Sequence, residues 1–242
     1  MNQNNFDNFA DCDAQPATLG EYERLSRIVS GLAHEIKNPL STVNLNLKLL
    51  GEDLARYHDP EHDRLVRRLQ RVQQECDRLK QTLDDFLRYA GRCELTCSKV
   101  DIRDTISEMS DFYGPQAQAA RVVMRITLPD KPIICMIDQN LIKQSILNLL
   151  INATQAMPEG GELIVKLSEQ NSNAKIEVID TGHGIDPEKI STIFDPYFST
   201  KAGGSGLGLA TALRIIREHA GNMTVDSELG KGTRFTITLK AI

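Results

Sequence analysis

Two long runs of apolar residues at helical spacing constrain the fold of this chain more than any other feature. The first run covers residues 25–54, and its apolar positions recur every three or four residues. The segment RYHDPEHD interrupts the pattern, and a second run covers residues 65–86. This spacing predicts two amphipathic helices, and the short interruption predicts that they fold back on each other as an antiparallel hairpin.

The predicted hairpin has more apolar surface than two helices can enclose. Arginines occupy the outer face of the second run, so its opposite face is the one to be buried. We therefore expect a second copy of the chain to cover the apolar stripes, which gives a homodimer built on a four-helix bundle. The arginines are Arg64, Arg67, Arg68, Arg71 and Arg78.

The sequence pattern changes near residue 95, where shorter helical and alternating segments replace the long runs. The fold class is therefore expected to be α+β, a helical hairpin followed by an α/β sandwich. We expect a disordered or truncated lead over residues 1–18, a helical domain over 19–94 and an α/β domain over 95–242. One expected helix begins at Arg103, and two others cover 138–157 and 207–219. The expected strands cover 122–128, 133–137, 162–168, 175–180, 222–228 and 233–239.

The composition is that of a globular protein, with 242 residues, 40% apolar and 25% charged. A net charge of -5 argues against a protein that coats nucleic acid. No apolar run approaches the roughly 20 residues that span a bilayer, and no Lys or Arg precedes Arg24, where a secretory signal would need one. We therefore expect a cytoplasmic location, no membrane contact from this chain and no nucleic-acid partner.

Two asparagines stand out in the expected helix over residues 138–157. Asn148 and Asn152 are four residues apart, so they share a face that the apolar residues of the helix leave free. They are either solvated or capping side chains, or they serve metal-phosphate chemistry. Mg²⁺ prefers hard oxygen ligands, and a neutral amide oxygen supplies one without repelling a triphosphate, which makes Asn152 the candidate metal ligand.

Two glycine-rich segments follow the asparagines. Asp180 ends a strand before Gly182 and Gly184, where a carboxylate could accept a hydrogen bond from the exocyclic amine of a base, or where the chain simply turns. A second segment leads into the last expected helix, an arrangement that aims backbone N–H groups and the positive helix end at phosphates. Its glycines are Gly204, Gly206 and Gly208. Neither the P-loop nor the Rossmann glycine pattern is present.

The order of these motifs, with IFDPYF at residues 193–198 between the glycine segments, resembles the ATP-binding domain of sensor histidine kinases. They match the N, G1, F and G2 boxes of that family. The resemblance implies a Bergerat-type α/β sandwich that binds ATP with Mg²⁺, with the G1 aspartate at the adenine and a mobile lid over about 186–206. The implied nucleotide-binding residues are Asn148, Asn152, Asp180, Gly182, Gly184, Phe194, Phe198, Lys201, Gly204, Gly206, Leu207 and Gly208, with Asn152 also holding the metal.

One position departs from the family pattern. Many relatives carry a basic residue three positions after the metal asparagine, whereas this chain has Gln155. The positive charge for the phosphates could come from Lys201 in the lid or from the helical domain, and a solvated loop lysine is the alternative reading of Lys201.

The segment HEIKNPL in the first helical run resembles the H box of the same family. The resemblance implies that His34 is the phosphoacceptor. The role suits histidine, since a neutral imidazole is a strong nucleophile and its ordinary pKa is ~6.5. Glu35 could take the proton from the other ring nitrogen as general base. Asn38, one turn later, could bind phosphate or orient a water against a partner's acyl phosphate.

Together the two halves predict ATP-dependent autophosphorylation of His34, then transfer to an aspartate of a response-regulator receiver domain, with dephosphorylation of that partner as a second activity. The alternatives are a dimeric scaffold that binds ATP as a conformational ligand and a clamp-type ATPase. The wording of NLLINATQAMPEGG and FDPYFSTKAGGSGLGL looks most like kinases of the nitrogen-regulation type.

Pro39 lies within the H-box segment and lacks the N–H that would bond the carbonyl of Glu35. It should weaken or bend the helix beside the phosphoacceptor. We hypothesise that this bend switches the chain between kinase and phosphatase poses, and the alternative is a tolerated proline.

Overall fold

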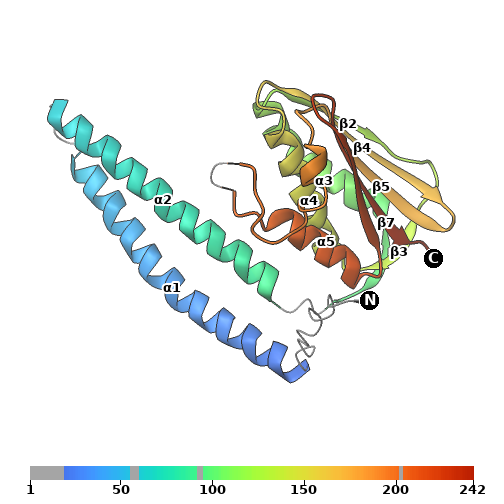
Figure 1. The fold of residues 1–242 in the computed structure, drawn as a ribbon, viewed down its shortest axis with the longest axis horizontal. Coiled ribbons are helices and arrows are strands. Elements are labelled where there is room, and N and C mark those ends of the chain that lie inside the picture. The colour runs from blue at the N-terminus through green and yellow to red at the C-terminus, as the bar shows by residue number, and fades with distance from the viewer. Residues whose placement is uncertain (1–18, 55–59, 92–94, 202–203) are drawn as a thin grey trace, which may run out of the picture.

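The computed structural model describes residues 19–54, 60–91, 95–201 and 204–242. A hairpin of two long helices extends from a compact α/β domain (Figure 1). The hairpin consists of α1 (Leu19–Leu54) and α2 (Pro60–Ala90). The predicted lead over residues 1–18 lies outside the described residues. None of the described helices is long and apolar enough to cross a membrane.

Helix α1 is continuous through Pro39, as the apolar spacing predicted. Directly after the proline, the hydroxyl of Ser41 donates to the carbonyl of Lys37 (2.8 Å), and the hydroxyl of Thr42 donates to the carbonyl of Asn38 (3.2 Å). Such bonds to the carbonyl four residues back favour helix bending. The segment next to the phosphoacceptor candidate therefore carries two independent features that weaken a straight helix.

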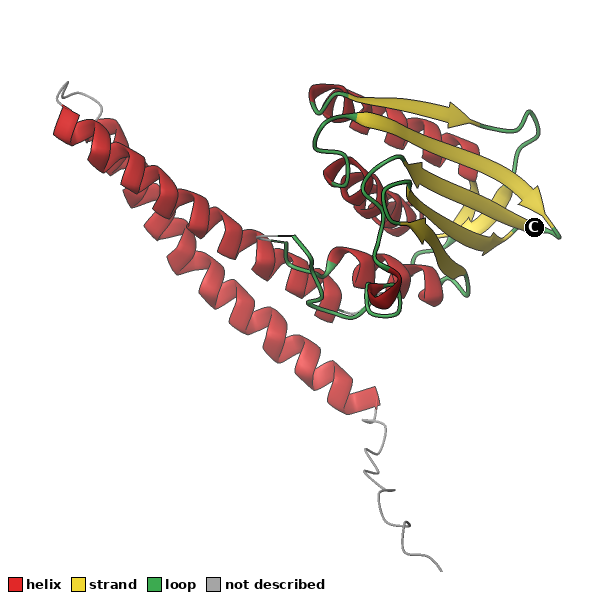
Figure 2. Cartoon of the chain, turned by 45° about the horizontal axis from the view of Figure 1, so that its top comes forward, coloured by secondary structure: helices red, strands yellow, loops and turns green. Residues whose placement is uncertain are grey.

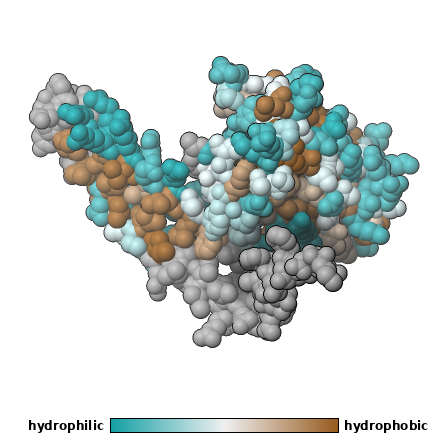
Figure 3. Space-filling view, in the orientation of Figure 1, coloured by the Kyte–Doolittle hydropathy of each residue, from teal (hydrophilic) through white to brown (hydrophobic). Residues whose placement is uncertain are grey.

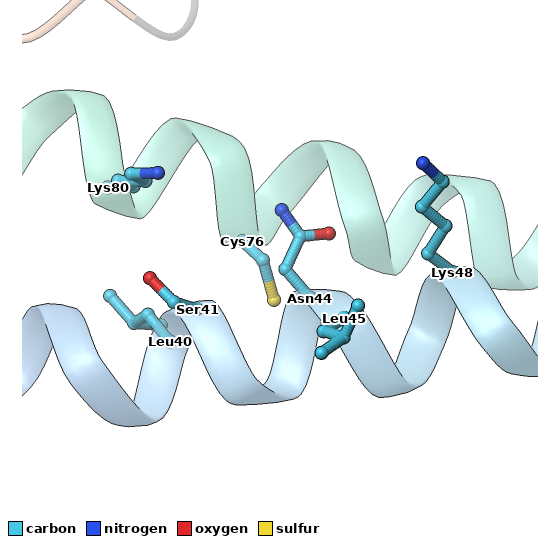
Figure 4. Close-up of a pocket in the computed structure, with 7 residues that line it drawn as sticks. All are labelled: Leu40, Ser41, Asn44, Leu45, Lys48, Cys76 and Lys80. Carbon is cyan, nitrogen blue, oxygen red and sulfur yellow. The ribbon is translucent and has the colours of Figure 1, made fainter.

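Polar contacts fix the register of the two hairpin helices. Lys37 Nζ lies 2.6 Å from Asp84 Oδ1, and Asn44 Nδ2 donates to Asp77 Oδ1 at 2.5 Å. Between the helices Cys76 points toward α1 beside Asn44, in a groove of about 230 Å³ (Figure 4). The groove is lined by Leu40, Ser41, Asn44, Leu45, Lys48, Cys76 and Lys80.

The hairpin leaves large apolar side chains exposed. Their exposed fractions run from 41% to 58%, and brown apolar surface follows the hairpin in Figure 3. A single hairpin therefore does not bury its own apolar stripes, in agreement with the expectation from the sequence. These residues are Ile36, Val43, Leu45, Leu49 and Leu50 on α1 and Leu65, Val72 and Leu79 on α2.

The rest of the chain is an α/β sandwich, which confirms the predicted fold class. A five-stranded sheet has the order β2-β4-β5-β7-β6, with β2 parallel to β4 and the other pairs antiparallel, and β1 and β3 form a separate antiparallel pair. The elements are β1 (Ser98–Asp101), α3 (Ile102–Ala119), β2 (Val122–Thr127), β3 (Ile134–Ile137), α4 (Gln139–Gln155), β4 (Gly161–Gln170), β5 (Asn173–Asp180), a short 3₁₀ helix η1 (Pro187–Lys189), α5 (Gly208–Glu218), β6 (Asn222–Glu228) and β7 (Gly232–Lys240).

The helices α3, α4 and α5 lie together on one side of the large sheet (Figure 2). In β4 every second residue faces this layer, so Leu163, Val165 and Leu167 are buried while their neighbours are more exposed. From the helices, Ile146 and Leu149 of α4 are almost completely buried against them. This core holds the end of α4 and the start of α5 next to the end of β5 and the start of β7, where the candidate site lies.

Hydrogen-bonded caps set the start of α4. The carboxylate of Asp138 accepts the backbone N–H groups of Asn140, Leu141 and Thr96. Burial alone would raise the pKa of Asp138, but these donors hold it below the ordinary value. The backbone N–H of Asp138 in turn donates to Nε2 of His219 (3.0 Å), which ties the start of α4 to the end of α5.

Candidate nucleotide and phosphoacceptor site

A cavity of about 740 Å³ lies between α4, α2, the end of β5, the start of β7 and the described part of the lid segment (residues 186–201 and 204–206). This volume is within the range of small-molecule sites. The residues that the sequence motifs single out and that line the cavity are Asn148, Asn152, Asp180, Gly184, Phe198, Lys201, Gly204, Gly206 and Gly208. Four motifs spread over about 60 residues of sequence therefore meet at one cavity.

Three implied residues support the cavity from behind instead of lining it. Gly182 packs against the end of α4, where an added Cβ would lie 2.5 Å from the carbonyl oxygen of Ala156. Phe194 packs edge to face against Phe235 with ring centroids 6.4 Å apart. Leu207 is fully buried and anchors the start of α5. The close backbone packing at Gly182 and the packed side chains of Phe194 and Leu207 hold in place the motifs that do reach the cavity.

Asp180 is a buried carboxylate at the end of β5, with only 4% of its surface exposed. Its Oδ1 accepts the backbone N–H of Gly182 at 2.9 Å. Burial raises the pKa of Asp180, and backbone hydrogen bonds from Gly182 and Thr233 and the positive charge of Lys201 oppose that rise. A buried acceptor that lines a cavity is suited to a ligand N–H donor.

The two asparagines of α4 have different partners. Asn148 Nδ2 donates to the carbonyl of Gly208 (3.0 Å), so it links α4 to the first residue of α5. Asn152 Oδ1 accepts from Lys201 Nζ at 3.3 Å, and Gln155 Oε1 accepts from the same ammonium at 2.7 Å. An amide oxygen that already holds a cation fits the expected role of Asn152 as a Mg²⁺ ligand.

The lid segment closes onto the start of α5. Gly206 has a φ of +67°, and an added Cβ there would lie 2.5 Å from the backbone of Tyr197, so only glycine is tolerated. The backbone N–H of Tyr197 donates to the carbonyl of Gly206 at 3.1 Å. This contact folds the F-box segment against the G2 loop and places the positive end of α5 at the cavity.

Residues of α2 complete the cavity, and no sequence motif predicted their presence there. Gln81 and Asp85 line it, and Ser205 Oγ of the lid donates to Asp85 Oδ2 at 2.7 Å. Tyr89 lies one turn after Asp85 on α2. The guanidinium of Arg214, on α5, lies 5.7 Å from the centre of the Tyr89 ring and donates to the Tyr89 carbonyl. Because i and i+4 residues share a helix face, one face of α2 holds both contacts.

Of the H-box candidates, the structure describes the backbone of His34 and Glu35 within α1 and the exposed side chain of Asn38. Asn38 lies one residue after Lys37, whose ammonium pairs with Asp84 across the hairpin. The H-box turn is therefore opposite the turn of α2 that precedes Asp85.

Comparisons with known proteins agree with this architecture. Residues 24–91 match the His Kinase A phospho-acceptor domain, and residues 137–242 match the histidine kinase-, DNA gyrase B- and HSP90-like ATPase family. The chain therefore belongs to the histidine kinases, and it carries both the phospho-acceptor domain and the ATPase domain of that family.

Named relatives cover most of this chain. Sensor histidine kinase ZraS of Escherichia coli K12 is 34% identical over 89% of this chain and 45% of its own length, and sporulation kinase C of Bacillus subtilis is 31% identical over 88% and 48%. The crystal structure of full-length ShkA in complex with AMPPNP superimposes with a TM-score of 0.73 at 25% identity, over 89% of this chain and 46% of that one. The chain spans about half the length of these proteins.

Proposed function

We propose that this chain is a protein histidine kinase that moves the γ-phosphoryl group of ATP to His34. The main support is that the cavity with the nucleotide motifs is also lined by Gln81 and Asp85 of the hairpin. The pair between Lys37 and Asp84 sets the register of α1 against α2. The backbone of His34 lies three residues before Lys37, about 4.5 Å along the helix axis, so the H-box turn lies opposite the part of α2 that reaches the cavity.

The residues around the cavity suit ATP. Asp180 accepts the exocyclic amine of adenine, and the G2 loop with the positive end of α5 receives the phosphates. Asn152 offers its amide oxygen to Mg²⁺, which when bound neutralises negative charge on the phosphates. The AMPPNP complex of the ShkA structure supports a nucleotide at this fold position.

The transfer step needs one nucleophile and one base. A neutral imidazole nitrogen of His34 attacks the γ-phosphorus, an N–P bond forms, and the bond from phosphorus to the bridging oxygen breaks with its electron pair leaving on ADP. Glu35 accepts the proton from the other ring nitrogen, which prevents charge from building up on the ring.

The phosphoryl group then passes to an aspartate of a response-regulator receiver domain. Asn38 is exposed one turn after His34, where it can orient a water against the acyl phosphate of that partner. A homodimer through the exposed apolar faces of α1 and α2 completes the proposal, with domain boundaries at 19–94 and 95–242. The nitrogen-regulation subtype and the cytoplasmic location remain predictions from the sequence.

Incubation with γ-labelled ATP tests the kinase. Wild-type protein is expected to acquire an acid-labile, base-stable label, because phosphoramidates have that stability pattern. The label should disappear in His34→Gln and persist in His62→Gln, the matched change of a second histidine within the hairpin sequence. The label should then move to an added receiver domain.

Other results would support the alternatives. Free phosphate without labelled protein supports a clamp-type ATPase. Nucleotide binding without either label or free phosphate supports a dimeric scaffold, and label that persists in His34→Gln excludes this histidine as the phosphoacceptor.

A further inference from the structure

Gln155 is the last residue of α4, and its side chain lines the cavity. No basic side chain occurs in the last turn of α4. Instead, Gln155 Oε1 accepts from the ammonium of Lys201 at 2.7 Å, and that ammonium also lies 3.3 Å from Asn152 Oδ1. Two amide oxygens on one helical turn therefore share a cation that the lid provides.

Burial lowers the pKa of Lys201, and two neighbouring groups oppose this effect. The carboxyl end of a helix carries partial negative charge, and Lys201 Nζ lies at the carboxyl end of α4. The carboxylate of Asp180 also attracts it, which opposes the lowering of the Lys201 pKa by burial. A lysine on a flexible stem can follow a ligand while it stays near these groups.

Asn152 cannot keep the ammonium after a metal binds. Mg²⁺ sits about 2.1 Å from its oxygen ligands, and two cations on one amide oxygen repel each other strongly. Gln155 makes the shorter of the two contacts to Lys201 and is not itself a proposed metal ligand. It can therefore retain the ammonium one turn away from the metal when Asn152 exchanges one cation for the other.

We propose that Gln155 is a positioning residue that holds Lys201 beside the proposed metal site, so that the lid supplies a cation for the phosphates. This inference rests on the proposed binding of ATP with Mg²⁺. It makes lid closure and delivery of the positive charge a single event, since Lys201 reaches Gln155 only when the lid lies against α4. In this role Gln155 needs its amide oxygen, which accepts the hydrogen bond from the Lys201 ammonium.

Moving the cation from the lid to α4 tests this assignment. We would measure the Kd of Mg-ATP for the full chain carrying Lys201→Met, Gln155→Ala, both changes, and Gln155→Lys combined with Lys201→Met. Loss of a charge-assisted contact should weaken binding by roughly tenfold or more in Lys201→Met, and less in Gln155→Ala. The Ala/Met double variant should be no weaker than Lys201→Met, and Gln155→Lys should restore most of the loss.

Matched controls separate position from composition. Lys166→Met and Gln118→Ala change the same residue types at exposed sites on β4 and α3, and should leave the Kd unchanged. Additive losses in the double variant, or no recovery with Gln155→Lys, would overturn the positioning role. Asp180→Asn is measured in parallel. If it binds Mg-ATP as tightly as wild type, the proposed nucleotide site is wrong. If Asp180→Asn loses binding while the Lys201 and Gln155 variants keep the wild-type Kd, the nucleotide site stands and only the role of Gln155 is rejected.

Discussion

The hairpin and the α/β domain bury their apolar residues to very different degrees. In the α/β domain Leu149, Ile176 and Ile237 have no exposed surface, whereas the most buried apolar residues described in the hairpin, Leu69 and Cys76, each retain 9%. One part therefore holds its shape by its own core, and the other needs a partner. A phosphoacceptor on a helix stabilised by a partner can be repositioned without unfolding the domain that binds the nucleotide.

The largest expected effect contrasts two leucine truncations. Leu149→Ala removes a side chain from the α/β core and should lower the free energy of unfolding of that domain by about 2–5 kcal/mol. Leu79→Ala removes a side chain that is 56% exposed in the single chain. It should leave the unfolding of the α/β domain unchanged and weaken association of the hairpin instead.

Thermal unfolding at several protein concentrations measures this difference. The loss of thermal stability in Leu149→Ala should be independent of protein concentration. The loss of thermal stability in Leu79→Ala should shrink as the concentration rises, because mass action stabilises a dimer. Equal, concentration-independent losses in both variants would mean that the hairpin does not depend on a second copy.

The next effect separates ligand binding from stability within the α/β domain. Asp180→Asn replaces the buried acceptor, so the affinity for ATP should fall by about 100-fold, or roughly 2.7 kcal/mol. Stability should not fall, because burial already disfavours the ionised form of Asp180. Calorimetric titration and thermal melting of the same samples give the two numbers, and a parallel loss of both would show that Asp180 is mainly structural.

The sequence predicted the elements of both regions better than the contact between them. Helical spacing revealed α1 and α2, and alternation revealed the strands of the large sheet, because burial on one face imposes both periods. The sequence did not reveal β1 (SKVD) or η1 (PEK), since neither contains the apolar run that marked the equally short β3 (ICMI). The predicted β4 and β5 stopped short of the turn at Asn171 and Ser172, where positive φ values continue the hairpin.

The candidate site shows the same contrast between residues that the sequence predicted and contacts between regions that it did not. Motif order identified the cavity residues of α4, β5 and the lid, while Gln81 and Asp85 look like any other exposed polar residue of an amphipathic helix. Gln155 was visible only as a departure from the family pattern. Contacts between separately folded regions leave no periodic signal, so the structure was needed to find them.

A smaller effect is expected where the two regions meet. Asp85 places a carboxylate beside the loop proposed to receive phosphates, where Ser205 donates to it. Asp85→Ala should raise the affinity for ATP about threefold at low salt and less at high salt, because the repulsion is screened. Glu75→Ala is the matched control, since it removes the same charge from α2 ten residues earlier at an exposed position. Equal effects of both changes would mean that only net charge matters.

The smallest effect is a pH dependence confined to the α/β domain. The pKa of Asp180 is raised above the ordinary value of 3.8, mainly by burial. At a pH between the ordinary pKa of the unfolded state and the raised pKa of the folded state, folded Asp180 keeps a proton that unfolded Asp180 has lost. The contribution of Asp180 to stability therefore falls as pH rises through that window and is constant above it. Asp180→Asn lacks this contribution. Its stability relative to wild type should therefore increase with pH across the window and then stay level.

Urea unfolding of both proteins from about pH 3 to pH 7 measures the difference, which cancels groups common to the two. Asp101 is one such group: its hydrogen bond with Arg103 lowers its pKa, so its stabilising contribution is lost as pH falls. A difference curve that declines with pH would mean that the ionised form of Asp180 stabilises the fold. A rising curve would mean that ionised Asp180, the residue proposed to bind adenine, lowers the stability of the α/β domain. The hairpin differs, because its stability is limited by apolar faces that only a partner can bury.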